Sequence, residues 1–265
     1  MFTEHTKNGI VYMTSSVLPA FHAFSTRFGG VSTGEFSTLN FGSNRGDDPS
    51  AVKENYRRWC EVFNEAEDKC CVTKQVHGNV VKVVSSADRH IPLSEIPYEA
   101  DGLVTNQRGL PIFCFTADCV PVLLCDEKGK SVGAVHCGWK GSVADILKNT
   151  VDAMRSLGTE TENITAAIGP SIGRCCFETD ADVPEAIEKY LSGDTEGLWD
   201  IHGNKFYVDL REANRRRLIQ LGLDPEKIDV SEECTVCSHD KYWSARYTAK
   251  HGLKRGSLSA GIVLG

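Results

Sequence analysis

The chain has 265 residues, of which 41% are hydrophobic and 25% charged, and its net charge is −7. This composition is ordinary for a globular protein that buries a sizeable core. The acidic balance argues against the broad basic surface that nucleic-acid binding requires. No apolar run approaches the length of a membrane span. We therefore expect neither a nucleic acid nor a membrane as a partner.

The elements in chain order begin with a helix. Apolar spacing predicts a helix capped by Ser50 that runs to Phe63, then strands over residues 80–84, 102–105, 112–116, 120–125 and 131–135. A capping box of Ser142 and Asp145 predicts a helix ended by Gly158, followed by a strand over 164–168, a helix over 182–191 and a helix that follows Asp209 and ends near Gly222.

These elements predict a mixed α/β (α+β) fold. Several strands, such as 120–125, are apolar on both faces, which is typical of strands covered on both sides. The loop-like segments 29–48 and 192–203 have regular elements on either side, and no repeat or linker divides the chain. We expect one domain over residues 1–265, with β-sheets inside and helices packed outside.

The N-terminus and the cysteines bear on the compartment. Residues 1–10 lack the basic and then apolar layout of a signal peptide. The chain has 11 cysteines, an odd number, which favours reduced thiols in a cytoplasmic protein over a disulfide framework. The adjacent pairs Cys70-Cys71 and Cys175-Cys176 are typical of strand positions that face opposite ways. We expect a cytoplasmic protein.

Candidate metal ligands occur where apolar strands end in tight or glycine-rich stretches. Side chains from separate strands can converge on a cleft at such places. The segments are Gln-Val-His-Gly at 75–78 with His77, Ala-Asp-Cys-Val-Pro at 117–121 with Cys119, and Ala-Val-His-Cys-Gly-Trp-Lys-Gly at 134–141 with His136.

Two imidazoles and a thiolate suit zinc, and three protein ligands with an open position are the catalytic pattern. Cys137 should point away because it neighbours His136 on a strand, and Asp118 is a candidate for orienting a histidine ring. From the residues alone, three alternatives remain: hydrogen-bonded core histidines, a nucleophilic Cys119 with a histidine base, and copper. A multicopper oxidase would need more histidines than the eight here, which include no His-x-His pair.

A single C-x-x-C pair, Cys234 and Cys237, stands near the C-terminus. Zinc ribbons use two such pairs, and a zinc deaminase would need a Pro-Cys lead-in and a His-x-Glu partner. The pair is therefore interpreted chiefly as structural.

Several basic or amide side chains stand beside glycine-rich or polar turns. Such turns leave backbone N–H groups free to meet an anion, which suits a phosphorylated or phosphate-requiring substrate. Neither a P-loop nor a dinucleotide-binding glycine motif is present. The candidate phosphate-binding residues are Arg27, Asn44, Arg45, Lys140 and Arg246.

Ordered motifs along nearly the whole chain resemble the laccase-domain (polyphenol oxidase-like) family, whose members are also called purine nucleoside phosphorylases or peptidoglycan editing factors. The motifs are Phe-Ser-Thr-Arg-Phe-Gly-Gly-Val-Ser at 24–32, Leu-Asn-Phe-Gly at 39–42, Gly-Asp-Asp-Pro at 46–49, Gln-Val-His-Gly at 75–78, Ala-Asp-Gly at 100–102, Thr-Ala-Asp-Cys-Val-Pro at 116–121, His-Cys-Gly-Trp-Lys-Gly at 136–141, Ile-Gly-Pro-Ser-Ile-Gly at 168–173 and Cys-Thr at 234–235.

The resemblance implies a metal site at His77, Cys119 and His136 and an enzyme that phosphorolyses adenosine, inosine and methylthioadenosine, with adenosine deamination as a further reaction. The donor set favours zinc as the metal. Copper-dependent phenol oxidation and cysteine-dependent editing of peptidoglycan precursors, which the family names suggest, are the alternatives. Lys140 stands where the family often has arginine, and residues 242–247 replace a more aromatic run. A lysine would hold phosphate as a point charge with looser geometry.

Overall fold

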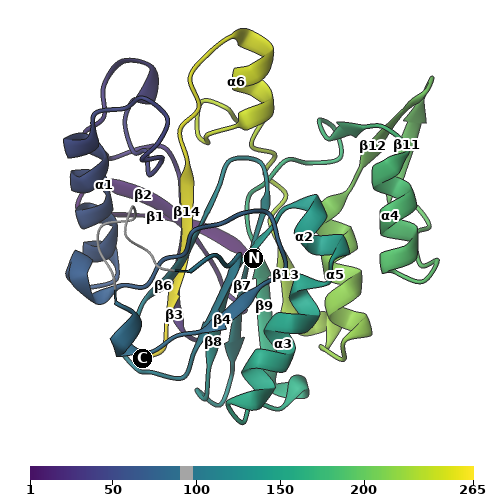
Figure 1. Cartoon of the computed structure of the whole chain (residues 1–265), viewed down its shortest axis with the longest axis horizontal. Helices are drawn as coiled ribbons and strands as arrows, with labels where there is room; N and C mark the ends of the chain where they lie inside the picture. Colours follow the sequence, from purple (N-terminus) through teal and green to yellow (C-terminus); the bar gives the residue numbers. More distant parts are fainter. Residues whose placement is uncertain (90–97) are drawn as a thin grey trace.

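The computed structural model describes residues 1–89 and 98–265. Figure 1 shows two central sheets with helices on their outer sides. The helices are α1 (Pro49–Val62), α2 (Trp139–Val143), α3 (Ile146–Ser156), α4 (Asp182–Tyr190), α5 (Leu210–Gln220) and α6 (Ala245–His251). The strands are β1 (Phe2–Lys7), β2 (Ile10–Ser15), β3 (Phe21–Ser25), β4 (Val81–Val83), β5 (Gly102–Thr105), β6 (Ile112–Thr116), β7 (Val120–Asp126), β8 (Val132–Cys137), β9 (Ile164–Ile168), β10 (Glu178–Thr179), β11 (Trp199–His202), β12 (Lys205–Val208), β13 (Ile228–Val230) and β14 (Leu258–Val263).

The strands form three sheets. A five-stranded sheet has the order β1-β2-β3-β14-β6, and all its pairings are antiparallel. A six-stranded sheet has the order β13-β9-β7-β8-β5-β4 and is mixed, because β13 with β9 and β4 with β5 are parallel pairs. The small sheet β10-β12-β11 lies at the periphery beside α4 (Figure 1).

Three apolar layers hold these elements together. One lies between α1 and the five-stranded sheet and includes Trp59 and Phe113. The second lies between the two large sheets, where Ile112 and Leu123 meet. The third joins the other face of the six-stranded sheet to α3, α4 and α5. The predicted α/β arrangement, with sheets sandwiched between helical layers, is confirmed.

The central strands match their predicted ranges: residues 102–105, 112–116 and 164–168 are β5, β6 and β9. Strands β1, β2, β3 and β14 are not among the predicted elements. Strand β1 is largely exposed, so it lacks a buried apolar face, and β14 includes the small residues Ser259 and Gly261. Gly261 is required there, because a Cβ at this position would lie 2.2 Å from the Phe113 ring.

Two predicted helix starts are wrong. The cap of α1 is Asp48, whose carboxylate accepts a hydrogen bond from the Ser50 N–H at 2.9 Å, with Pro49 at the first helical position. The box of Ser142 and Asp145 does not form, because the chain breaks into α2 and α3 at Asp145, which has a φ of 67°. The Asp145 carboxylate instead pairs with Arg217.

The start of α5 was predicted correctly: the Asp209 carboxylate accepts a hydrogen bond from the Glu212 N–H at 3.0 Å. The described residues also include α6, which was not predicted and which Ser244 caps by accepting from the Tyr247 N–H. Within residues 1–89 and 98–265, no helix has both the length and the apolar character to cross a membrane.

Candidate metal centre

The three predicted metal ligands lie at one end of the six-stranded sheet. Cys119 immediately precedes β7 and His136 is near the end of β8. These strands are antiparallel and Pro121 lies opposite His136, so the two ligands are neighbours across the sheet. His77 lies in the segment before β4, a strand that joins the same sheet through β5.

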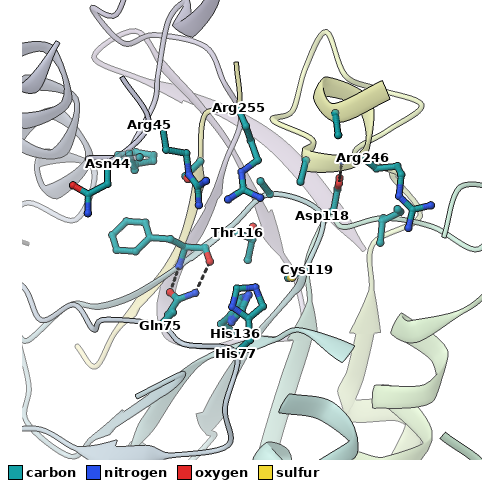
Figure 2. A pocket seen from close by; sticks show the side chains of 18 of the residues that line it. Asn44, Arg45, Gln75, His77, Thr116, Asp118, Cys119, His136, Arg246 and Arg255 are labelled. Carbon is teal, nitrogen blue, oxygen red and sulfur yellow. Dashed lines mark hydrogen bonds between the residues drawn. The ribbon is translucent and has the colours of Figure 1, made fainter. Parts of the chain in front are cut away.

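This arrangement brings together one donor atom each from His77, Cys119 and His136, all within 4.8 Å of one another. The two imidazole rings are edge to face, with centroids 4.8 Å apart (Figure 2). His136 is buried and Cys119 half-buried, whereas His77 is exposed. The cluster therefore has a closed side and an open side.

Asp101, a fully buried residue directly before β5, organises the cluster. Its carboxylate accepts from the backbone N–H groups of Val76, His77 and Gly78 at 3.1, 2.9 and 2.8 Å. The same carboxylate lies 2.8 Å from Nδ1 of His136. With Nδ1 bonded to Asp101, the Nε2 atom of His136 is available to the cluster.

Asp118 was predicted to orient a histidine ring, and that prediction is wrong. Its carboxylate accepts from the Thr235 hydroxyl at 2.6 Å and from the Arg246 N–H at 2.6 Å. Asp118 also has a φ of 86°, an uncommon conformation for a residue with a side chain. These two bonds link the C-terminal segment to the turn that carries Cys119.

The charges of the cluster support one another. Burial raises the pKa of Cys119, but hydrogen bonds and charge interactions with His136 and His77 outweigh it and lower the pKa to about 6. Burial lowers the pKa of His136, yet hydrogen bonds with Asp101 and Cys119 raise it to about 9. Cys119 is thus favoured as a thiolate, the form that binds metals.

Gly138 provides room between the three ligands. A Cβ at this position would lie 3.3 Å from Cδ2 of His77, 3.4 Å from Sγ of Cys119 and 3.4 Å from Cε1 of His136. A side chain there would occupy space next to the donor atoms. The donor set and this space fit a zinc ion, whose protein ligands are nitrogen and sulfur at short distances.

The cluster opens into a cavity of about 770 Å³. The cavity lies between the end of the six-stranded sheet, the loop before α1, and the segment around α6 and β14 (Figure 2). Its lining includes aromatic, cationic and polar groups: Phe41, Asn44, Arg45, Gln75, Phe115, Asp118, Trp139, Ile172, Phe177, Arg246, Arg255 and Ser257, together with the three candidate ligands.

Three of the five predicted phosphate-binding residues, Asn44, Arg45 and Arg246, line this cavity. Arg27 does not, because its guanidinium donates to the carbonyl oxygens of Ser37 and His239 and stacks on the Trp243 ring at 3.7 Å. Lys140 is exposed on α2 and is likewise outside the cavity lining. The Arg246 guanidinium lines the cavity but already donates to the carbonyl oxygens of Cys176 and Glu178.

Arg255 also lines the cavity, although it is not among the predicted phosphate-binding residues. The sequence pattern that indicated Arg27, a basic residue close to a glycine, also occurs at Arg255, which precedes Gly256. Neither Arg45 nor Arg255 forms an ion pair with any residue in the described part of the chain. Partial burial and the nearby positive charge of Arg255 lower the pKa of Arg45. Figure 2 shows the two guanidinium groups side by side.

Fold and site together define a mixed α/β protein with a His–Cys–His cluster at strand ends. The cluster is open to a cavity that contains Arg45 and Arg255, two arginines without an ion-pair partner among residues 1–89 and 98–265. Residues 21–265 match the family model described as multi-copper polyphenol oxidoreductase laccase. The chain belongs to this family.

Relatives with purine nucleoside names are similar over most of the chain. A purine nucleoside phosphorylase of Bacteroides thetaiotaomicron is 31% identical over 252 residues, which are 92% of this chain and 91% of the relative. The purine nucleoside phosphorylase YfiH of Escherichia coli is 34% identical over 84% of this chain and 86% of its own length. The crystal structure of YlmD from Geobacillus stearothermophilus superposes with a TM-score of 0.92 and 29% identity, covering 99% of this chain and 98% of that one.

Proposed function

We propose that this protein is a zinc-dependent purine nucleoside phosphorylase, acting on adenosine, inosine and methylthioadenosine, with adenosine deamination as a side activity. The observation that carries the proposal is that the His–Cys–His cluster and the Arg45–Arg255 pair line one cavity. A phosphorolytic enzyme must bind a nucleoside and an inorganic anion together, and this cavity combines apolar walls with cationic groups. The names of the relatives support the same activity.

Zinc is favoured over copper by the environment of the cluster. A trigonal His₂Cys copper site normally has a weak thioether ligand. None of the three methionines lines the cavity: Met13 and Met154 are buried in apolar layers, and Met1 is at the exposed N-terminus. His77, Cys119 and His136 would hold the ion, which when bound supplies Lewis acidity at an open coordination position.

Arg45 and Arg255 would bind phosphate. Two neighbouring cations repel each other when no anion lies near them, and an oxyanion removes that repulsion while accepting several N–H bonds. The Asn44 side chain, also in the lining, can donate to the same anion. The aromatic groups Phe115 and Trp139 offer flat apolar surfaces for a purine.

In phosphorolysis, a phosphate oxygen forms a bond to C1′ of the ribose while the bond from C1′ to the purine nitrogen breaks. The electron pair of that bond leaves with the base, which takes up a proton, and ribose 1-phosphate is the other product. Because Nε2 of His136 would be a metal ligand, that atom cannot also carry this proton, and Asp101 would instead keep the His136 ring oriented toward the ion. The Arg45–Arg255 pair would keep the attacking phosphate next to the sugar.

The direct test is to incubate the zinc-loaded protein with adenosine or inosine, with and without phosphate. The proposal expects free base and ribose 1-phosphate only when phosphate is present, and inosine from adenosine as a slower product. A correctly folded, zinc-loaded protein that forms no base with phosphate would contradict it. Oxygen uptake with phenols would favour the copper reaction instead.

Replacing Arg255 with alanine should raise the KM for phosphate about 10- to 100-fold, which corresponds to the loss of one or two charge-assisted hydrogen bonds. The KM for the nucleoside should change much less, and Arg255→Lys should give an intermediate value because it retains only the charge. Initial rates at varied phosphate would measure this. Arg155→Ala on α3 is the matched control, since Arg155 is exposed and outside the cavity. An equal effect on both KM values would contradict an anion site at Arg255.

A second candidate function is a cysteine-dependent hydrolase of peptidoglycan precursors. The observation that favours it is that Cys119, His136 and Asp101 form a hydrogen-bonded series like that of cysteine hydrolases. This enzyme would keep its activity after chelation, whereas the phosphorylase would lose it.

The thiol of Cys119 should react with iodoacetamide in metal-free protein, with a midpoint near pH 6. Because hydrogen bonds and charge from the two histidines outweigh burial, the pKa of Cys119 is lowered to about 6, so the thiolate persists above that pH and is lost below it. Peptide mass spectrometry across the pH range would follow the reaction. Buried Cys114, for which burial raises the pKa to about 12, is an internal control. Zinc should block the reaction of Cys119. If the pH midpoint of the reaction were that of an ordinary thiol, the proposed stabilisation of the Cys119 thiolate by His77 and His136 would be contradicted.

A further inference from the structure

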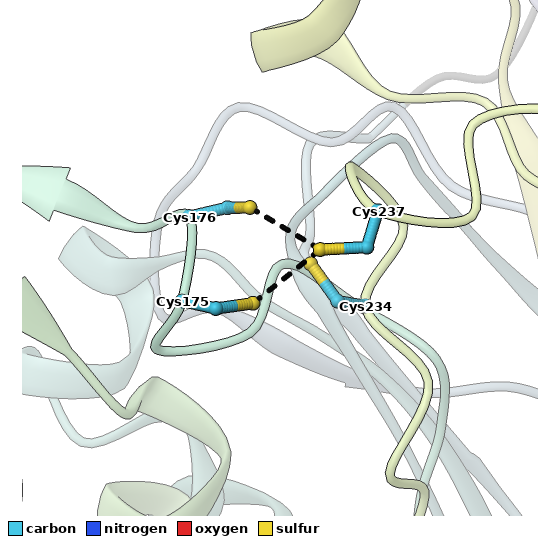
Figure 3. Close-up of side chains that lie close together, drawn as sticks. All are labelled: Cys175, Cys176, Cys234 and Cys237. Carbon is cyan, nitrogen blue, oxygen red and sulfur yellow. Dashed lines mark hydrogen bonds between the residues drawn. The ribbon is translucent and has the colours of Figure 1, made fainter.

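Four cysteines form a second cluster at the same end of the molecule. Cys175 and Cys176 lie in a turn after β9, and Cys234 and Cys237 lie in the segment between β13 and α6. Their four sulfur atoms lie within 4.8 Å of one another (Figure 3). The prediction that Cys175 and Cys176 face opposite ways along a strand is wrong, because the turn directs both thiols to the same point. Cys70 and Cys71 do face different apolar layers.

Backbone pairing holds the two cysteine segments together. Ser171 and Cys234 form an isolated parallel bridge, in which the Thr235 N–H donates to the Ser171 carbonyl at 3.0 Å. The Gly173 N–H donates to the sulfur of Cys234 at 3.2 Å. Such N–H···S bonds stabilise a thiolate, because the negative charge on sulfur accepts them more strongly than a thiol does.

Gly173 allows the close approach of the thiols. A Cβ at this position would lie 3.2 Å from Cβ of Cys234 and 3.4 Å from the sulfur of Cys175. The site is therefore formed by the backbone of both segments as well as by the four side chains.

The distances do not single out a disulfide pair. The sulfur of Cys237 lies 3.6 Å from that of Cys175 and 3.5 Å from that of Cys176, so it has two equivalent neighbours. One disulfide would use two thiols and leave the other two crowded beside it. A single ion with four thiolate ligands uses all of them, and tetrahedral Cys₄ coordination is one of the usual structural zinc sites. Cys234 is buried, while Cys175 and Cys237 are exposed, so an ion has an entry path from solvent.

We propose that Cys175, Cys176, Cys234 and Cys237 bind one structural zinc ion, separate from the His77–Cys119–His136 cluster. The C-x-x-C pair supplies two ligands, and the adjacent pair from the β9 turn replaces the second C-x-x-C of a zinc ribbon. The site does not depend on the proposed catalytic activity.

The ion would fasten one wall of the cavity. Ile172 and Phe177, which flank Cys175 and Cys176, both line it. Arg246 also lines the cavity, and its guanidinium donates to the Cys176 carbonyl at 3.1 Å. Metal binding would thus join the turn after β9 to the segment that leads into α6.

The test is elemental analysis of the full chain, purified under reducing, oxygen-free conditions. The wild type should contain two zinc ions per chain, Cys119→Ala and Cys237→Ser one each, and the double variant none. Cys125→Ala is the matched control and should keep two, because Cys125 is at the opposite end of β7 and belongs to neither cluster. Cobalt-loaded Cys119→Ala should give the intense bands of a tetrahedral tetrathiolate site.

Hydrogen exchange provides a readout that is independent of activity. Loss of the ion in Cys237→Ser should increase exchange in residues 171–177 and 234–246 and leave residues 75–78 unchanged. If this variant does not fold, titration of the wild type with an organomercurial decides: one zinc should be released as four thiols react.

Three outcomes would overturn the proposal: unchanged zinc content in Cys237→Ser, no zinc in folded Cys119→Ala, or a disulfide between Cys237 and Cys175 or Cys176 in the protein from reducing, oxygen-free purification. Iron on the four thiolates would overturn the assignment of zinc. Because these results count metal ions, they stand apart from any failure to detect phosphorolysis.

Discussion

Replacing Cys119 with alanine is expected to remove one equivalent of bound metal and to lower kcat/KM for phosphorolysis by ~10³-fold or more. Losses of this size are typical when one member is removed from a set of catalytic groups that act together. Cys119 is the only anionic donor of the candidate centre, and two neutral imidazoles bind zinc far more weakly than the full set. Elemental analysis and initial rates of base formation, measured on the same preparation, would test both effects.

Cys137→Ala is the matched control for this variant. Cys137 is the residue next to His136, but it is fully buried in the apolar layer on the other face of the sheet. Its removal should leave the metal content unchanged. If Cys119→Ala kept the full metal content and the activity of the wild type, the assignment of the metal centre to His77, Cys119 and His136 would be wrong. If it lost the metal and kept the activity, the reaction would take place elsewhere.

Replacing Asp101 with asparagine is expected to weaken metal binding about 10- to 100-fold, the usual cost of losing a partner that orients a ligating histidine. The free energy of unfolding should also fall by about 1–3 kcal/mol, because an amide cannot accept from His136 and from three backbone N–H groups at once. Competition with a zinc chelator and denaturant unfolding would measure the two effects.

Asp126→Asn is the control that separates the loss of His136 orientation from the loss of stability caused by replacing any buried carboxylate. Asp126 is also fully buried, but it is at the other end of β7, where it accepts from the Lys128 N–H at 2.7 Å. This variant should lose some stability and retain its metal affinity. Equal metal affinities in the two asparagine variants would contradict the role of Asp101.

The core of the fold could be predicted because its strands are apolar on both faces. Residues 102–105, 112–116 and 164–168 have this pattern, and each forms the expected strand. Strand β1 could not be found in the same way, since its side chains are mostly exposed and its residues are held by pairing with β2. The order of the strands depends on pairing between distant segments, which local periodicity does not encode.

The site was predicted in part. The sequence by itself determined the kinds of donor atom available, because imidazole nitrogen and thiolate sulfur are donors that zinc accepts. The ordered motifs connected His77, Cys119 and His136 to one family, to which the matched residues 21–265 assign the chain. Residue type also indicated Asn44, Arg45 and Arg246, which line the cavity.

Only the tertiary structure decided which neighbours act on these groups. Asp101 is the partner of His136 because β5 and β8 pair antiparallel, which sets Gly102 opposite Val135 and brings the carboxylate to Nδ1. Contacts between distant segments also bind the Arg27 guanidinium to backbone carbonyl oxygens and bring two isolated cysteine pairs together as one four-thiol cluster. Arg255, in contrast, lines the cavity without an ion-pair partner among the described residues. Such outcomes depend on distances between segments far apart in the chain, and composition and spacing contain no measure of those distances.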